Sequence, residues 1–267
     1  MTFKTKVVVT GSSGLACSLL LDRFSQLEAY SFLFTDNRSG CASEKNFIMG
    51  DITSYEFCLT LLKGASCLIH LAGCSNPDGS ARDILSANIV GAHNLFTACA
   101  ENEVNKIIFA SSNRVVEGLE DDCLNSVESV QTEHDTENLQ FFPTRLYGAS
   151  KVWGEALLDV FCSEDPRRKA ISLRVGTLWP VEFDALSTDE LVRTILENNG
   201  GFYNEIDVAS FRRRQSFLRV SSRKWQSAIE KILGTEWTGH VIRALDANGE
   251  SWITERRGSS NFKFFGE

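Results

Sequence analysis

The chain begins with an apolar, β-branched run that ends at a glycine-rich turn. Residues 6–10 read Lys-Val-Val-Val-Thr, which is typical of a buried strand. Gly11-Ser12-Ser13-Gly14 follows at once, and a helical stretch is expected over 15–24. In this order Gly11 allows a tight turn and Gly14 the close approach of a pyrophosphate, which the N–H groups at the helix start would bind. The segment therefore predicts a βα unit that binds a dinucleotide.

The residue at the end of the next strand indicates which dinucleotide. We expect that strand at 30–35, and Asp36 follows it. A carboxylate about 20 residues past the glycine turn accepts hydrogen bonds from the adenosine ribose and repels a 2′-phosphate. NAD is therefore favoured over NADP as the cofactor, although Arg38 weakens this preference. The alternative is a glycine turn in an ordinary βα unit.

Strands and helices are expected to alternate along most of the chain. The expected strands are 6–10, 30–35, 46–50, 67–72, 106–111 and 170–175, and the longest helices are expected near 80–102 and 145–164. Such alternation predicts an α/β fold of the Rossmann type, a doubly wound parallel sheet with helices on both faces. We assign residues 1–176 to the NAD-binding domain and 177–267 to a small C-terminal substrate-binding lobe and tail. The acidic stretch 113–143 is either a cover for a substrate pocket or a solvated loop.

Tyr147 and Lys151 are four residues apart at the start of the expected helix 145–164. On a helix this spacing puts the phenol and the ammonium on one face. A nearby ammonium stabilises a phenolate, so we expect Lys151 to lower the pKa of Tyr147 towards working pH. Tyr147 then becomes a candidate general acid/base. The spacing alone is a weak signal and gains weight from the dinucleotide site. His70, in contrast, lies within an apolar strand pattern and is expected to be a hydrogen-bonded core residue.

Composition and charge exclude several classes of protein. The 267 residues are 43% hydrophobic and carry a net charge of -8, which gives nucleic-acid binding no electrostatic support. Arg212-Arg213-Arg214 is a local exception to this negative charge. A solvated basic turn is favoured for it over a binding site for an anionic group. No apolar run has the length of a membrane span. Eight scattered cysteines without metal-ligand spacing predict reduced thiols, a cytoplasmic protein and no bound metal.

Several further motifs occur in a fixed order over residues 6–180, and the order resembles that of the extended short-chain dehydrogenase/reductase family, the NAD-dependent epimerases and dehydratases. The motifs are Gly-x-x-Gly at 11–14 with Cys17 where a third glycine is usual, Gly50-Asp51-Ile52, 68–73 (Leu-Ile-His-Leu-Ala-Gly), 88–95 (Asn-Ile-Val-Gly-Ala-His-Asn-Leu), 107–113 (Ile-Ile-Phe-Ala-Ser-Ser-Asn), Tyr147-x-x-x-Lys151 and 173–177 (Leu-Arg-Val-Gly-Thr). The resemblance covers about two thirds of the chain. It implies enzymatic hydride transfer, with the acid/base work supplied by the protein.

The resemblance also assigns roles to individual residues. Tyr147 would exchange a proton with a substrate oxygen, Lys151 would bind the nicotinamide ribose, and Ser112, chosen over Ser111, would hold the same substrate oxygen. The residues expected to contact NAD are Gly11, Ser13, Gly14, Leu15, Asp36, Asp51, Ile52, Leu71, Ala72, Gly73, Asn88, Tyr147 and Lys151. The residues expected to contact substrate are Ser75, Ser112, Asn113, Arg114 and Thr177. Homodimers are common in this family through helices that include the one carrying Tyr147.

Within the family, local motifs are most similar to uronate dehydrogenase-like proteins, which oxidise a sugar acid with NAD. These motifs are Ala110 to Arg114, Ala72 to Ser75 and Leu186-Ser187-Thr188. Where the subgroup has an arginine for the substrate carboxylate, this chain has Phe183-Asp184-Ala185, so Asp184 is expected to repel a uronate unless Arg114 or another cation compensates. A neutral or differently charged polyol therefore remains open as the substrate. The segment 214–222 resembles one in nucleotide-sugar epimerases and dehydratases, which leaves that activity open. A non-catalytic NAD sensor or scaffold is the third reading.

Overall fold

The computed structural model describes residues 4–39, 46–118, 141–198, 218–236, 238–246 and 249–256. Eight strands form one sheet in the order β10-β9-β6-β5-β4-β1-β2-β3. Seven of them run parallel, and β10 pairs antiparallel with β9 at one edge. Their bounds are β1 Thr5–Thr10, β2 Tyr30–Asp36, β3 Phe47–Met49, β4 Cys67–His70, β5 Lys106–Ser112, β6 Lys169–Val175, β9 Gly239–Asp246 and β10 Gly249–Arg256. The predicted α/β fold with a doubly wound parallel sheet is confirmed.

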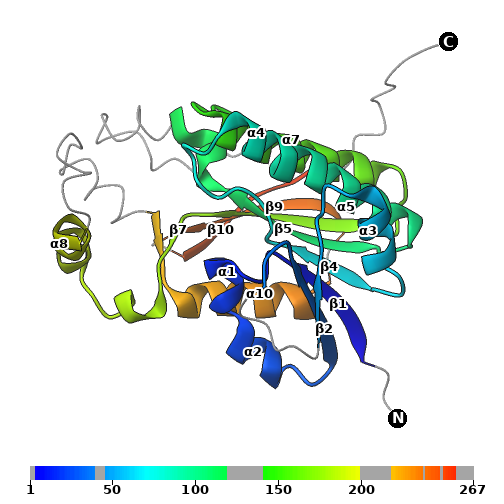
Figure 1. Cartoon of the computed structure of the whole chain (residues 1–267), viewed down its shortest axis with the longest axis horizontal. Helices are drawn as coiled ribbons and strands as arrows, with labels where there is room; N and C mark the ends of the chain where they lie inside the picture. Colours follow the sequence, from blue (N-terminus) through cyan, green and yellow to red (C-terminus); the bar gives the residue numbers. More distant parts are fainter. Residues whose placement is uncertain are drawn as a thin grey trace.

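Helices cover both faces of this sheet, and the molecule has three layers (Figure 1). One face carries α3 (Tyr55–Leu61), α4 (Ala81–Ile84), the π-helix η2 (Leu85–Gly91), α5 (Ala92–Glu101) and α7 (Leu146–Ser163). The other face carries α1 (Leu15–Ser18), α2 (Leu21–Gln26) and α10 (Ser222–Gly234). The remaining elements are the 3₁₀-helices η3 (Asn113–Val116) and η5 (Val181–Phe183), the helix α8 (Thr188–Asn198) and the two-stranded sheet of β7 (Thr177–Leu178) and β8 (Arg219–Val220).

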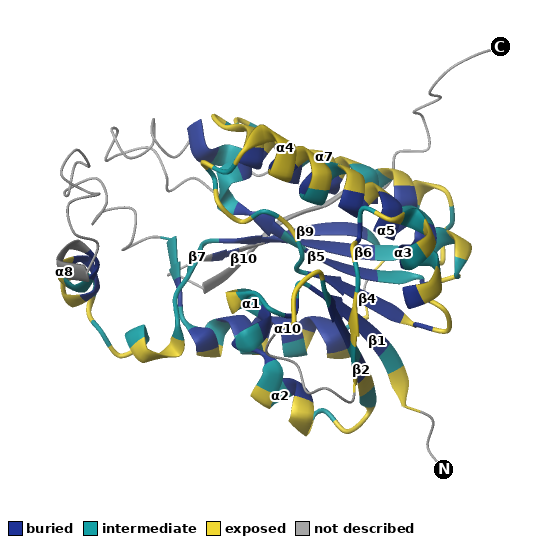
Figure 2. Cartoon of the chain, in the orientation of Figure 1, coloured by how far each residue is buried: buried dark blue, intermediate teal, exposed yellow. Residues whose placement is uncertain are grey.

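Alternate residues of the central strands belong to two separate hydrophobic clusters, one on each face of the sheet. On β1, Val7 and Val9 belong to the cluster beneath α10, whereas Val8 belongs to the cluster beneath α3 and α5. This follows from the two-residue period of a strand, whose side chains point alternately to opposite faces. Because helices cover both faces, the central strands are buried on both sides and read as continuous apolar runs (Figure 2).

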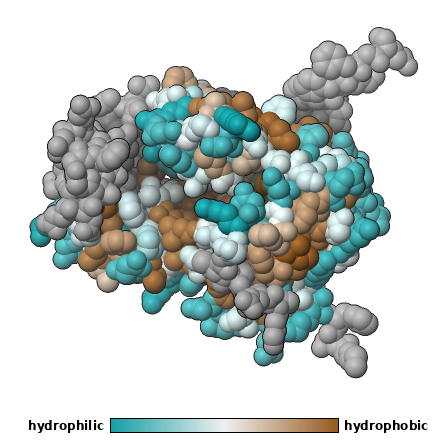
Figure 3. Space-filling view, in the orientation of Figure 1, coloured by the Kyte–Doolittle hydropathy of each residue, from teal (hydrophilic) through white to brown (hydrophobic). Residues whose placement is uncertain are grey.

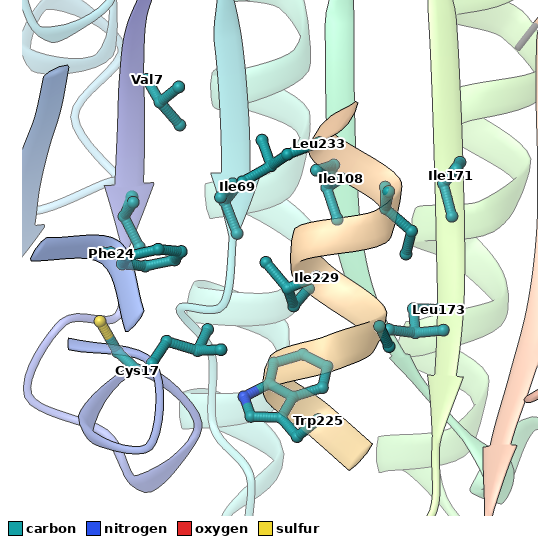
Figure 4. Close-up of a cluster of buried hydrophobic side chains, with 14 of the residues drawn as sticks. Val7, Cys17, Phe24, Ile69, Ile108, Ile171, Leu173, Trp225, Ile229 and Leu233 are labelled. Atoms are coloured by element: carbon teal, nitrogen blue, oxygen red, sulfur yellow. The ribbon is translucent and has the colours of Figure 1, made fainter. Parts of the chain in front are cut away.

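The segment after residue 176 contributes to the same sheet. Strand β9 pairs with β6 from Lys169↔Gly239 to Val175↔Leu245. Helix α10 lays Trp225, Ile229 and Leu233 against the strand residues of the sheet (Figure 4). Residues 177–267 therefore do more than form a substrate-binding side, because α10 and β9 complete the layered core. The boundary at residue 176 itself stays a prediction.

Two of the expected helices differ from the prediction in detail. The stretch 15–24 is interrupted at Leu19 and Leu20, so α1 is a single turn followed by α2. The expected helix near 80–102 is continuous from 81 to 101, but η2 winds as a π-helix in its middle. The hairpin of β9 and β10 was not expected. Most of the acidic stretch 113–143 and the triplet 212–214 lie outside the described residues, as does His134. Among the helices that are described, none has the length and apolar character of a membrane span.

Candidate active site

A cavity of about 850 Å³ opens at the carboxyl ends of the central strands. The chain winds outward from β1 through β2 to β3, and from β4 through β5 to β6 in the other direction. Strands β1 and β4 are thus the point where the strand order reverses, and ligands of open α/β sheets bind in the crevice there. Figure 3 shows this face hollowed between the layer of α4 and α7 and the layer of α1 and α10. The volume is within the usual range of small-molecule sites.

The glycine turn after β1 is pressed against the chain that leaves β4. Gly11 has a φ of +77°, and a Cβ on it would lie 2.5 Å from the backbone nitrogen of Ala72. Gly14 precedes the first turn of α1, and its N–H donates to the carbonyl of Gly11 at 3.1 Å. Gly73, with a φ of +150°, would bring a Cβ to 2.6 Å from Asn88 Oδ1. These contacts keep side chains out of the cavity floor, so the cavity has a glycine-lined cradle of the kind a pyrophosphate requires.

Asp36 lies at the rim of the cavity at the end of β2. Its carboxylate accepts the N–H of Ser13 at 3.0 Å and the N–H of Arg38 at 3.2 Å. These bonds fix the carboxylate beside the glycine turn, where each oxygen keeps lone-pair capacity for ribose hydroxyls. The side chain of Arg38 is 75% exposed, and its Nε lies 3.9 Å from the Asp36 carboxylate. Asp51 and the buried Ile52 line the same end of the cavity.

Ser112, Tyr147 and Lys151 come from β5 and α7 and meet at the other end of the cavity. Ser112 lies close enough to Tyr147 for the two hydroxyl groups to interact, and this interaction lowers the pKa of Tyr147 in part. Lys151 Nζ donates to the carbonyl of Ala110 at 2.8 Å and lies 5.8 Å from the centre of the Tyr147 ring. The site thus places three groups side by side, namely a phenol that can exchange a proton, a hydroxyl and an ammonium. These are the proton and hydrogen-bond donors that hydride transfer to or from a carbon–oxygen group needs.

The electrostatics of this cluster differ from the sequence prediction. Burial raises the pKa of Tyr147 above 10, although the interaction with Ser112 and the charge of Arg114 lower it in part. Burial also lowers the pKa of Lys151 to about 8, opposed by the charge of Glu155. The expected depression of the Tyr147 pKa by Lys151 is absent because desolvation of the phenolate dominates and the ammonium is turned towards Ala110.

Two neighbours of the cluster have structural partners. Asn88 Oδ1 accepts the N–H of Cys74 at 2.7 Å, and its Nδ2 donates to Ser150 Oγ at 3.0 Å. Asn88 is therefore buried behind Gly73, where it ties the segment after β4 to α7 without lining the cavity. Ser111 Oγ donates to Glu155 Oε1 at 2.6 Å. That bond leaves Ser112 as the hydroxyl that reaches Tyr147.

His70 is a core residue, as its sequence context predicts. Its Nδ1 lies 2.8 Å from Thr10 Oγ1, and its ring stacks on Phe109 with centroids 5.6 Å apart. Burial, with a contribution from Lys151, lowers the pKa of His70 to about 3. His70 is thus neutral at ordinary pH and holds β4 to β1 and β5.

The residues expected to meet the substrate lie around the end of the cavity that holds Ser112. Ser75, Asn113, Arg114 and Thr177 all line it. Arg114 forms an ion pair with the buried Glu117, whose other oxygen accepts the hydroxyl of Thr144 at 2.7 Å. The positive charge of Arg114 is therefore compensated within the protein.

Asp184 does not face the cavity, which corrects the expectation that it repels a sugar acid. Its two oxygens accept the backbone N–H of Ser222 at 3.2 and 3.0 Å, and one also accepts the Ser222 hydroxyl. Ser222 begins α10, so the carboxylate satisfies N–H groups at a helix N-terminus. Arg219 donates to the carbonyls of Phe183 and Leu186 and fixes the same segment.

Of the predicted NAD contacts, all but Ser13 and Asn88 line the cavity. Sequence reasoning missed other lining residues, among them Asp83 and Ser86 from α4 and η2 and Trp225 from α10. The indole of Trp225 donates to the carbonyl of Ala16 at 2.7 Å, across 209 positions of the chain. The amphipathic spacing of α10 marks Trp225 only as a buried residue, and no local signal places it beside α1. Among the described residues, no group of acidic, histidine or cysteine side chains could hold a metal ion.

The comparisons with known proteins identify the family. Residues 7–201 match the NAD dependent epimerase/dehydratase family, and the chain belongs to it. The resemblance to extended short-chain dehydrogenases is confirmed, and NAD is the cofactor of this family. The glycine cradle, Asp36 and the cluster around Tyr147 fit that cofactor.

Individual relatives are distant. The chain is 23% identical over 175 residues to L-arabinose 1-dehydrogenase (NAD(P)(+)) of Haloferax volcanii, a match of 65% of this chain and 67% of that protein. It is 24% identical over 176 residues to uronate dehydrogenase of Agrobacterium fabrum, covering 66% and 62% of the two chains. The matched parts thus span about two thirds of each relative. The structure resembles that of a mutated uronate dehydrogenase with a TM-score of 0.67 and 23% identity, over 91% of this chain and 74% of the other.

Proposed function

We propose that this protein is an NAD-dependent sugar oxidoreductase that oxidises a hydroxyl-bearing carbon of a sugar. The observation that carries the proposal is the meeting of Ser112, Tyr147 and Lys151 at one end of a cavity whose other end holds Asp36. The family is one of enzymes, which favours catalysis over a non-catalytic sensor or scaffold.

The chain's own residues hold the cofactor and move one proton. Gly11, Gly14 and Gly73 would give the pyrophosphate room, Asp36 would bind the adenosine ribose, and Lys151 would bind the nicotinamide ribose. NAD, when bound, would supply the acceptor for the hydride that leaves the substrate carbon. Tyr147 takes the proton of the hydroxyl on that carbon, so the C–H and O–H bonds become C=O and the products are NADH, a proton and a carbonyl compound or lactone. Ser112 donates a hydrogen bond to the same oxygen and holds it near Tyr147.

The raised pKa of Tyr147 bears on this step. A phenol that is neutral in the free protein is a competent acid for reduction, whereas oxidation needs the phenolate. Turning the Lys151 ammonium from the Ala110 carbonyl towards the cofactor and Tyr147 would supply the stabilising charge. We therefore expect cofactor binding to lower the pKa of Tyr147.

We further propose that the preferred substrate is a neutral sugar. Arg114 is paired with Glu117, and Asp83 also lines the cavity. Apart from the Lys151 ammonium, which donates to the carbonyl of Ala110, the described side chains here thus offer no uncompensated positive charge to a carboxylate or a phosphate. A substrate without an ionised group avoids that mismatch.

The test is NADH formation with matched pairs of aldoses and their uronic acids, run with the wild type and with Tyr147→Phe. We expect the neutral sugar to be oxidised with the higher kcat/KM. Tyr147→Phe should lower the rate by about 10²–10⁴-fold and leave the affinity for NAD nearly unchanged. Full activity in that variant would refute the assignment of Tyr147.

A second candidate function is that of a nucleotide-sugar epimerase or dehydratase, which the family name includes. Such an enzyme regenerates its cofactor and gives no net NADH. Product analysis with a panel of nucleotide-sugars would reveal it when the free sugars give no signal.

We also propose a homodimer formed through α7. Leu146, Trp153 and Val160 are each at least 40% exposed and are spaced seven residues apart, so they lie along one side of the helix. Sedimentation equilibrium of the wild type and of Trp153→Glu tests this, and a monomeric wild type would refute it.

The proposal of a reducing, cytoplasmic setting is supported by free thiols at Cys58, Cys67, Cys74, Cys99 and Cys162. Thiol titration of protein purified without reductant would check it.

A further inference from the structure

A buried ion pair lies directly beneath the candidate site. Arg174 donates from Nε and Nη2 to the two carboxylate oxygens of Glu155 at 2.9 and 2.8 Å. The side chains are 3% and 0% exposed. Taking two charges out of water costs about as much as their attraction returns, so such a pair is weak evidence for a role in stability. Its position suggests another role.

Glu155 connects the elements that carry the catalytic residues. It lies on α7 one turn after Lys151, on the same face of the helix. Its Oε1 also accepts the hydroxyl of Ser111, the neighbour of Ser112 on β5. Arg174 stands on β6 directly opposite Ser111 in the register. One carboxylate thus fixes α7 against the two strands that hold the proton-transfer site.

Glu155 is also the carboxylate that acts on Lys151. The titratable groups that face this ammonium are Tyr147 and Glu155 on α7, His70 on β4 and Cys74 after β4. The pKa of His70 is lowered to about 3, so its imidazole is neutral at ordinary pH and does not offset the burial of a cation. Burial lowers the pKa of Lys151 to about 8, and Glu155 is the largest influence that raises it.

We propose that Glu155 is a positioning residue that stabilises the Lys151 ammonium, and that Arg174 holds Glu155 in place. The Ser111 hydroxyl fixes the same carboxylate at the strand that ends in Ser112. The catalytic consequence rests on the proposed function, but the charge state of Lys151 does not, because it can be measured without turnover.

The experiment is a ¹³C NMR titration of protein labelled at the lysine side chains, with the Lys151 signal assigned from Lys151→Met. The variants are Glu155→Gln and the double variant Glu155→Gln/Arg174→Met, which leaves no unpaired arginine in the core. Ser111→Ala is the matched control, because it removes one hydrogen bond to Glu155 and no charge. Thermal unfolding of each variant verifies that it is folded.

We expect the Lys151 titration to move to lower pH by about one unit or more in both Glu155 variants and to stay in place in Ser111→Ala. The alkaline limb of the kcat/KM profile should move in the same direction. An unchanged Lys151 titration in the double variant would overturn the proposal and leave the pair a structural one. If the wild type turns over no sugar, the proposed function fails while the titration still decides the role of Glu155.

Discussion

Replacing glycine with alanine tests different structural constraints at Gly11 and at Gly14. At Gly11 the φ of +77° disfavours any L side chain, and the new Cβ would lie 2.5–2.7 Å from backbone atoms of Leu71 and Ala72. Backbone cannot swing aside as a flexible side chain can. At Gly14 the φ is -84°, and a Cβ would meet only the carbonyl oxygen of Gly11 at 3.3 Å. We therefore expect the first substitution to damage the fold and the second to be tolerated by it.

The magnitudes follow from these contacts. The left-handed backbone at Gly11 costs about 1–2 kcal/mol once a Cβ is present, and overpacking against β4 adds about 1–3 kcal/mol. Gly11→Ala should thus lose about 2–5 kcal/mol in free energy of unfolding. In a domain of this size that corresponds to a fall in Tm of about 5–15 °C. Gly14→Ala should stay within about 1 kcal/mol of the wild type.

The assay is urea unfolding followed by circular dichroism, with NAD affinity measured by calorimetry on the folded variants. Gly14→Ala should weaken NAD binding despite its normal stability, because its methyl group occupies the approach of the pyrophosphate. A Gly11→Ala variant as stable as the wild type would show that the turn after β1 is not pressed against β4. Normal NAD affinity in Gly14→Ala would show that the pyrophosphate does not bind at this turn.

Two further predictions concern the cofactor and the pH range. Asp36→Ala should reduce the ratio of NAD affinity to NADP affinity by about tenfold, because it removes a charge that repels a 2′-phosphate. An unchanged ratio of the two affinities would show that the adenosine ribose does not bind at Asp36. The buried, neutral His70 has its pKa lowered to about 3, so its contribution to stability is complete above the unfolded value of 6.5 and is lost as pH falls towards 3. Between pH 6 and 4 the free energy of unfolding of the wild type should therefore fall more steeply with pH than that of His70→Asn. The difference between the two slopes should be about 1.4 kcal/mol per pH unit. Equal slopes in the two proteins would contradict this account.

The sequence carries much of the fold because local signals and layer packing agree over its first 176 residues. The apolar runs at β1, β2, β5 and β6 coincide with the observed strands to within one or two residues. The hairpin of β9 and β10 escaped prediction because no dinucleotide motif marks it, although Asn248-Gly249 is a dipeptide typical of hairpin turns. The break between α1 and α2 also escaped, since Leu19 and Leu20 continue an apolar pattern that does not reveal a local change in winding.

The candidate site was predicted in part for the same reason. Residues at strand ends, such as Gly11, Asp36 and Ser112, are brought to one edge by the parallel order of the strands. Trp225 reaches that edge only through the packing of α10 on α1, which joins positions more than 200 residues apart. The pKa of Tyr147 could not be inferred from spacing, because it depends on how completely the folded chain removes water from the phenol.

Asp184 shows how a position can match a relative's binding residue in sequence and have a different role in space. An acid in place of a substrate-binding arginine suggests repulsion of a sugar acid, yet the carboxylate is turned to the first residue of α10 and bonded there. The loss of the arginine and the gain of the acid therefore have separate consequences. The loss removes a cation from the substrate side, while the gain helps to fix α10 and with it Trp225 at the cavity. Under the proposed preference for a neutral sugar, the Arg114–Glu117 ion pair is the feature that leaves little net charge to attract a substrate carboxylate.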